Sequence, residues 1–142
     1  MAKFYTEEEH SRIIASVKEA EKETSGEIRI FIEPRCKVEI LDRAAFIFEQ
    51  LGIHNTKHRN GVLFYIAHDD KQFAILGDAG INTVVGDNFW DNIKAGMQKH
   101  FAEGKFAEGL INGIKETGEA LKKYFPAEAD DTNELPDEIT LG

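Results

Sequence analysis

Hydrophobic and polar residues follow two different periods along this chain. Residues 6–23 open with a Thr6–Glu9 capping box and then repeat apolar residues at helical spacing, which predicts a helix. From Glu27 to Glu33 an isoleucine occupies every second position, which predicts a strand with one fully apolar face. The unbroken apolar run 62–67 is typical of a central strand covered on both faces.

The remaining segments complete an alternation of strands and helices. We predict a short helix over 42–51, a hairpin arm over 72–76, a loop over 77–88, and two helices beginning near 89 and 106. A helix between two strands makes them parallel, whereas a tight turn makes the next strand antiparallel. The predicted fold is therefore α/β, an αβα sandwich in which a small mixed β-sheet is flanked by helices on both faces.

We divide the chain into one domain and one tail. Its 142 residues suffice for a single core, which we assign to residues 1–126. Residues 127–142 are rich in Asp and Glu and contain neither Lys nor Arg, so we predict an acidic, extended tail, which Leu135, Ile139 and Leu141 are able to pin to the domain. Several glycines in the last helical region indicate close packing there: Gly104, Gly109, Gly113 and Gly118.

The amino-acid composition argues against several classes of protein. The 26 acidic and 17 basic residues give a net charge of −9, which argues against a nucleic-acid partner. No stretch approaches the roughly 20 apolar residues of a membrane-spanning helix, so we expect no membrane insertion. The chain starts without a secretory signal, and Cys36 has no second cysteine to pair with. We therefore expect a cytoplasmic protein, and a monomer.

Polar residues are expected to meet at one edge of the predicted sheet. Two parallel strands begin there and the antiparallel strand ends there, so Glu27, Arg59 and Asp78 should be neighbours. The following loop brings three further oxygen donors toward this edge, namely Asn82, Asp87 and Asp91. A purely structural alternative is that Glu27 pairs with a nearby arginine on the surface and that an acid or amide of the loop caps the next helix.

Two kinds of ligand suit these residues. Carboxylate and amide oxygens favour a divalent cation, calcium ahead of magnesium, whereas Arg59 and Arg29 suit an anionic group. The histidines lack zinc spacing, and no glycine-rich phosphate loop or nucleophile elbow is present, so we predict no organic cofactor. Asp69 and Asp70 are explained by their hairpin turn.

Several short motifs resemble a known family through their order and spacing. They are Thr24-Ser25-Gly26-Glu27-Ile28-Arg29-Ile30, Arg59-Asn60-Gly61-Val62-Leu63, Gly77-Asp78-Ala79-Gly80-Ile81, Asp87, and Phe106-Ala107-Glu108-Gly109-Leu110. Together they resemble the TPM domain family over about residues 6–126, as a short cytosolic branch of it.

The resemblance implies an αβα sandwich with a groove for calcium or another divalent ion, and acid phosphatase activity is attributed to plant relatives. Asp78 and Asp87 match acidic groove positions, whereas relatives often have a glutamate where this chain has Asn82. The leading hypothesis is therefore a domain that binds a divalent cation. The alternatives are a weak metal-assisted acid phosphatase and a non-enzymatic adaptor in protein assembly or repair, which would have a protein partner.

Overall fold

A computed structural model describes residues 4–86, 88–127 and 139–142, and these residues form five helices and four strands. In chain order the elements are α1 (Glu7–Glu21), β1 (Glu27–Glu33), α2 (Ile40–Gln50), β2 (Gly61–Ala67), β3 (Gln72–Gly77), α3 (Ala79–Val85), α4 (Phe89–Ala102), α5 (Phe106–Tyr124) and β4 (Ile139–Leu141). The predicted α/β fold, with a mixed sheet between layers of helices, is confirmed.

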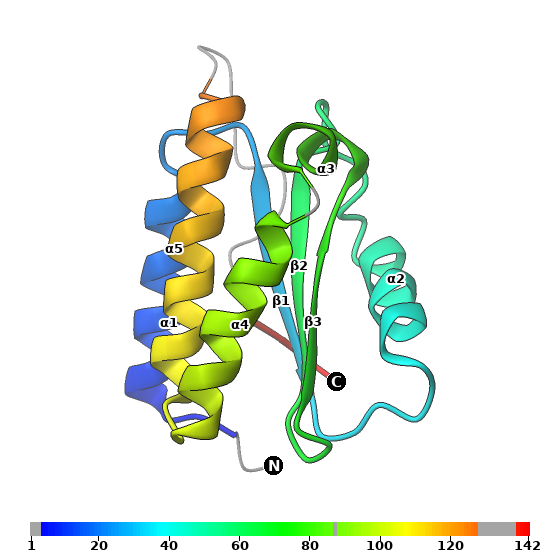
Figure 1. Cartoon of the computed structure of the whole chain (residues 1–142), viewed down its shortest axis with the longest axis vertical. Coiled ribbons are helices and arrows are strands. Elements are labelled where there is room, and N and C mark those ends of the chain that lie inside the picture. Colours follow the sequence, from blue (N-terminus) through cyan, green and yellow to red (C-terminus); the bar gives the residue numbers. More distant parts are fainter. Residues whose placement is uncertain (1–3, 87, 128–138) are drawn as a thin grey trace.

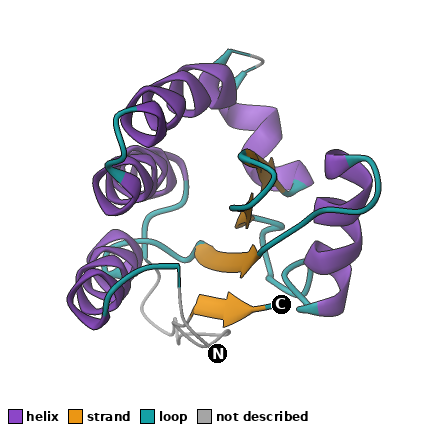
Figure 2. Ribbon diagram, turned by 90° about the horizontal axis from the view of Figure 1, so that it is seen from below, coloured by secondary structure: helices purple, strands orange, loops and turns teal. Residues whose placement is uncertain are grey.

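The sheet has the strand order β3-β2-β1-β4. β1 and β2 run parallel with Glu27 opposite Gly61, β3 returns antiparallel to β2, and β4 lies parallel to β1 at the other edge. Helices α1, α4 and α5 lie on one side of the sheet and α2 lies on the other (Figure 1; Figure 2). The predicted strand directions are therefore correct.

Both faces of β1 are buried, because each faces a separate core. Ile28, Ile30 and Ile32 pack into the larger apolar cluster, which includes residues of α1, α4 and α5. Phe31 belongs to a second cluster together with residues of α2. The polar residues of the strand are consequently buried as well, namely Glu27, Arg29 and Glu33.

Glycines allow the helices of the larger layer to approach closely. A Cβ atom at Gly118 would lie 2.6 Å from the Cβ of Ala20 on α1, and one at Gly113 would lie 2.7 Å from the sulfur of Met97 on α4. The predicted role of glycine in close packing is confirmed at these two positions, where a methyl group would force neighbouring atoms apart. It is wrong for Gly104, which has a φ of 76° and where a Cβ atom would meet nothing within 4 Å.

Two elements were not predicted from the sequence. The segment expected to be a loop after β3 contains α3, which begins where the Asp78 side chain accepts a hydrogen bond from Ala79 N. Residues 139–141 of the expected tail form β4. Within the described residues, no helix has the length and apolar character needed to cross a membrane.

Candidate functional site

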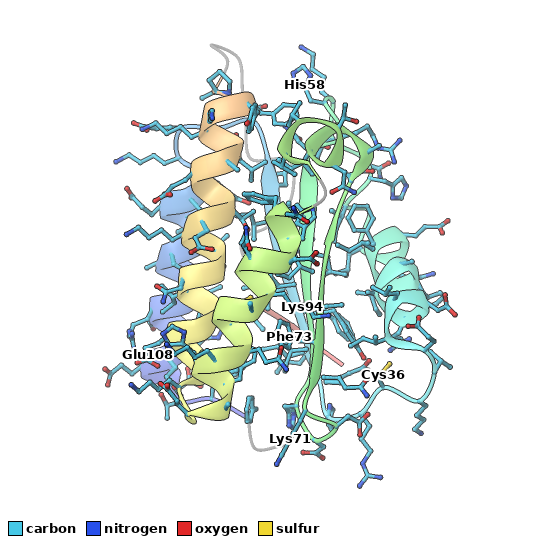
Figure 3. The ribbon with its side chains drawn as sticks, viewed as in Figure 1. Cys36, His58, Lys71, Phe73, Lys94 and Glu108 are labelled. Atoms are coloured by element: carbon cyan, nitrogen blue, oxygen red, sulfur yellow. The ribbon has the colours of Figure 1, made fainter. Side chains whose placement is uncertain are left out.

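The edge of the sheet where β1 and β2 begin also receives the end of β3. The N–H of Asp78 donates to the carbonyl oxygen of Gly61 at 2.9 Å, and Glu27 lies opposite Gly61 on the other side of β2. His58 marks this end of the molecule in Figure 3, whereas Lys71 marks the opposite end. The sequence-predicted residues Glu27, Arg59 and Asp78 therefore come from one end of the sheet.

Asp78 and Arg59 form a bidentate ion pair at this end. Arg59 Nε donates to Oδ2 at 2.6 Å and Arg59 Nη2 donates to Oδ1 at 2.7 Å. The Asp78 side chain is 6% exposed, whereas the Arg59 side chain is 54% exposed. Hydrogen bonds to Asp78, and its negative charge, raise the pKa of the Arg59 guanidinium. A buried carboxylate is thus neutralised by a cation that stays largely in solvent.

The backbone around Arg59 is fixed against the start of α3. Arg59 has a φ of 52°, a left-handed conformation that costs a non-glycine residue energy. Its carbonyl oxygen accepts hydrogen bonds from Gly80 N at 2.8 Å and Ile81 N at 3.3 Å. A Cβ atom at Gly80 would overlap the carbonyl oxygen of His58, so only glycine fits where the loop meets α3.

The amide of Asn82 is already engaged. Its Nδ2 donates to the carbonyl oxygen of Gly77 at 2.8 Å, and its Oδ1 accepts from Trp90 Nε1 at 2.7 Å. Asp91 follows Trp90 in the first turn of α4 and is exposed. Asp87 lies outside the described residues.

Glu27 is separated from Asp78 by β2. Neighbouring strands lie about 4.8 Å apart, so β1 and β3 are roughly 10 Å apart across β2. Ile53 covers Gly61 between them, because a Cβ atom at Gly61 would lie 2.5 Å from Ile53 Cγ2. Within the described ranges, no group of three or more His, Cys, Asp and Glu side chains is arranged to hold a metal ion.

Arg29, the second predicted anion-binding residue, is buried on β1. Its Nη2 donates to Thr140 Oγ1 of β4 at 3.2 Å. It thus belongs to the β1–β4 edge, whereas Arg59 lies next to α3. The structure therefore places the two arginines in separate environments.

A second polar cluster, at the opposite end of β1, was missed by the sequence reasoning. Glu33 accepts hydrogen bonds from Arg43 Nε at 2.9 Å and Arg43 Nη2 at 3.0 Å, and also from the hydroxyl of Tyr65. Burial alone would raise the pKa of Glu33, but the hydrogen bonds from Arg43 and Tyr65 outweigh it and lower this pKa. The pKa of Tyr65 is raised, first by its burial and then by its interactions with Glu33 and with the half-buried Cys36.

The only sequence signal for this cluster is a glutamate at the end of an apolar strand, followed ten residues later by an arginine in the predicted helix. Because Arg43 comes from α2, the cluster ties that helix to β1. Its groups satisfy one another, so we assign it a structural role.

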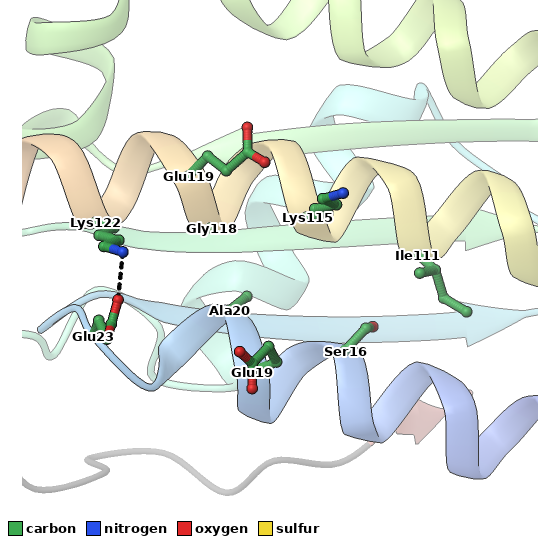
Figure 4. Close-up of a pocket in the computed structure, with 9 residues that line it drawn as sticks. All are labelled: Ser16, Glu19, Ala20, Glu23, Ile111, Lys115, Gly118, Glu119 and Lys122. Atoms are coloured by element: carbon green, nitrogen blue, oxygen red, sulfur yellow. Dashed lines mark ion pairs between the residues drawn. The ribbon is translucent and has the colours of Figure 1, made fainter.

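A groove between α1 and α5 encloses about 330 Å³ (Figure 4). Ala20 and Gly118 are among its lining residues, and across it Lys122 Nζ lies 2.5 Å from Glu23 Oε2. None of the sequence-predicted site residues lines this groove.

Comparison with solved structures identifies proteins of the same shape. The chain has a TM-score of 0.93 and 46% identity to the NMR structure of BA42 protein from the psychrophilic bacterium Bizionia argentinensis, covering 100% of this chain and 98% of that one. It matches the N-terminal domain of cg2496 protein from Corynebacterium glutamicum with a TM-score of 0.66 and 10% identity, over 96% of this chain and 80% of that one.

A third match is the N-terminal domain of a protein from P. gingivalis, with a TM-score of 0.70 and 19% identity, covering 85% of this chain and 78% of that one. The two matches below 25% identity show the fold alone. No curated protein matches the chain. A family model described as the TPM domain matches residues 1–120. With this match over most of its length, the chain belongs to the TPM domain family.

Proposed function

We propose that this domain binds a divalent cation weakly beside Asp78, calcium in preference to magnesium, in exchange for the guanidinium of Arg59. The observation that supports this proposal is the Asp78–Arg59 pair, in which a carboxylate only 6% exposed already holds a positive group that is 54% exposed. An exposed guanidinium is able to move into water when another cation takes its place, and the buried carboxylate remains compensated.

The donor set near Asp78 suits a weak, water-rich site. Calcium takes roughly six to eight oxygen ligands at flexible distances. Asp78 supplies a carboxylate, exposed Asp91 lies at the start of α4, and Asn82 contributes its oxygen only if Trp90 releases it. Water must supply several ligands, so we expect a dissociation constant on the order of millimolar. Asp87 stays a predicted ligand.

Exchange of the cation would also change what Arg59 does. A guanidinium released from Asp78 keeps its charge and regains two hydrogen-bond donors, which suit a phosphate or carboxylate. Binding of an anionic partner would then be coupled to binding of the metal ion. This coupling links the site to the alternative function, phosphate-ester hydrolysis, because the anionic partner would then be a phosphate ester.

Calcium titrations monitored by amide NMR test whether calcium displaces the Arg59 guanidinium from Asp78. Asp78→Asn keeps a side chain able to cap α3 but removes the charge, and Arg59→Gln removes the competing cation. We expect Arg59→Gln to bind calcium several-fold more tightly than the wild type, and Asp78→Asn to lose the shifts around α3.

Asp69→Asn is the matched control, because Asp69 lies in the turn between β2 and β3 at the other end of the sheet. It should leave the titration unchanged. Equal affinities of the wild type and Arg59→Gln would show that calcium does not compete with the guanidinium. Hydrolysis of a generic phosphate ester that is unchanged in Asp78→Asn would count against the enzymatic alternative.

A further inference from the structure

The outer edge of β1 is covered by a short strand from far along the chain. β4 pairs in parallel with residues 30–32 of β1 and, within the described part of the chain, contributes Ile139–Leu141 to the sheet. These residues lie beyond the segment 1–120 that matches the TPM family model.

Each residue of the segment 139–142 lies in a different environment. Ile139 is buried in the larger core cluster, and the Thr140 hydroxyl accepts from Arg29 Nη2 at 3.2 Å. Leu141 is half exposed. Gly142 donates its N–H to the carbonyl oxygen of Ile32 at 2.8 Å, and its Cα lies close to the ring of Phe31, where a Cβ atom would come within 2.7 Å.

These contacts define what the edge recognises. It takes an apolar side chain first, then a hydroxyl that reaches Arg29, then a half-exposed residue, and then a glycine, where a Cβ atom would press on the side chains of Phe31 and Glu33. Backbone hydrogen bonds along β1 supply the rest of the attraction, as in other proteins that bind a peptide by adding it to a sheet.

We propose that the edge of β1 is a peptide-docking groove that β4 closes within the same chain, and that it accepts an extended segment of a protein partner with the sequence pattern apolar, Ser or Thr, any residue, Gly. The described pairs between β1 and β4 are few, so opening of this edge costs far less than global unfolding. The attached strand competes at a high effective concentration, which keeps the groove closed until a partner segment of higher affinity replaces it.

The direction of the backbone hydrogen bonds provides a matched pair of variants. Because Gly142 N–H points to β1 and alternate residues of a strand point the same way, the Thr140 N–H also points to β1, whereas the Leu141 N–H points outward. Thr140→Pro therefore removes a hydrogen bond of the ladder. Leu141→Pro removes an N–H that the ladder does not use.

The assay measures fluorescence anisotropy of a labelled peptide with the sequence of residues 136–142, added to full-length protein. We expect the Thr140→Pro protein to bind the peptide at least tenfold more tightly than either the wild type or the Leu141→Pro protein does. The reason is that β4 of the Thr140→Pro protein no longer competes for the edge. A peptide carrying alanine in place of the final glycine should bind at least tenfold more weakly. Ile139→Asp opens the edge without a proline and should behave like Thr140→Pro.

Amide spectra establish whether β1, β2 and β3 stay folded in each variant. Folded Thr140→Pro and Ile139→Asp proteins that fail to bind the peptide would overturn the proposal, as would equal binding by all proteins. Light scattering at increasing protein concentration tests whether a second copy of this chain occupies the groove instead. A wild-type dimer that is lost in Ile139→Asp would identify the groove's occupant as a second copy of this chain, and would overturn its assignment to a separate partner.

Discussion

Replacing Glu33 by glutamine tests whether the polar cluster at the end of β1 stabilises the protein through its charge. The Glu33 side chain is 10% exposed and accepts hydrogen bonds from two groups of Arg43 and from Tyr65. Glutamine keeps the size and one carbonyl oxygen, but it turns the second acceptor into a donor. That donor would face groups that are themselves donors.

The expected loss of stability follows from these contacts. Removing one partner of a fully buried ion pair costs roughly 3–5 kcal/mol, because the other charge is left uncompensated. Arg43 is 30% exposed and is therefore able to gain water when Glu33 loses its charge. We expect the free energy of unfolding at neutral pH to fall by about 2 kcal/mol, close to the value of one hydrogen bond to a charged group.

The pH dependence separates charge from packing. The pKa of Glu33 is lower in the folded protein than its ordinary value of 4.5. Its ionised form therefore stabilises the fold fully above about pH 4.5, and this contribution is lost as the pH falls through the lower, folded pKa. The difference between wild type and Glu33→Gln should be largest at neutral pH and should shrink as the pH falls below about 4.5.

Urea unfolding followed by the fluorescence of Trp90 measures this difference. Glu103→Gln serves as the control, because Glu103 forms an exposed pair with Lys105 at 3.5 Å. That variant should unfold like the wild type. A Glu33→Gln protein whose loss is the same at neutral and acidic pH would show that packing or geometry, and not the ionised carboxylate, is responsible.

Three further substitutions test other contacts. Tyr65→Phe should lower stability by about 1–2 kcal/mol. The raised pKa of Tyr65 makes its contribution complete below about pH 10 and lost at higher pH, so the phenylalanine variant should show a flatter alkaline unfolding profile. Gly80→Ala should cost about 3 kcal/mol in a thermal or urea melt, since its methyl group meets the backbone of the loop before β2. Gly96→Ala, in open space on α4, should instead raise stability by up to about 1 kcal/mol.

Most of the fold was predictable because its longer elements carry strong periodic patterns. The alternating isoleucines of β1 and the apolar run of β2 determined the strands, and a connecting helix of ordinary length determined that they are parallel. α3 has only seven residues and contains Gly80, so its apolar residues Ile81, Val84 and Val85 span too short a stretch to predict a helix. β4 is shorter still and follows a segment rich in acids.

Only those features of the candidate site that depend on strand direction were predictable from the sequence. Parallel strands and a hairpin were sufficient to bring Glu27 and Asp78 to one end of the sheet. The packing of Ile53 over Gly61 keeps them apart, and that contact depends on the path of the loop after α2. A pattern of residues along the chain contains no information about this path.

Hydrogen bonds decide what each polar group at this end is free to do. The left-handed backbone at Arg59 lets its carbonyl oxygen bind the start of α3 while its side chain returns to Asp78. Any cation that binds Asp78 must therefore displace a guanidinium without disturbing that backbone. Because the displaced group is already largely in water, the exchange removes few buried contacts. A substitution at Arg59 leaves the buried Asp78 carboxylate without its cation, so Arg59→Gln should lower the stability of the calcium-free protein and regain part of this loss when calcium binds.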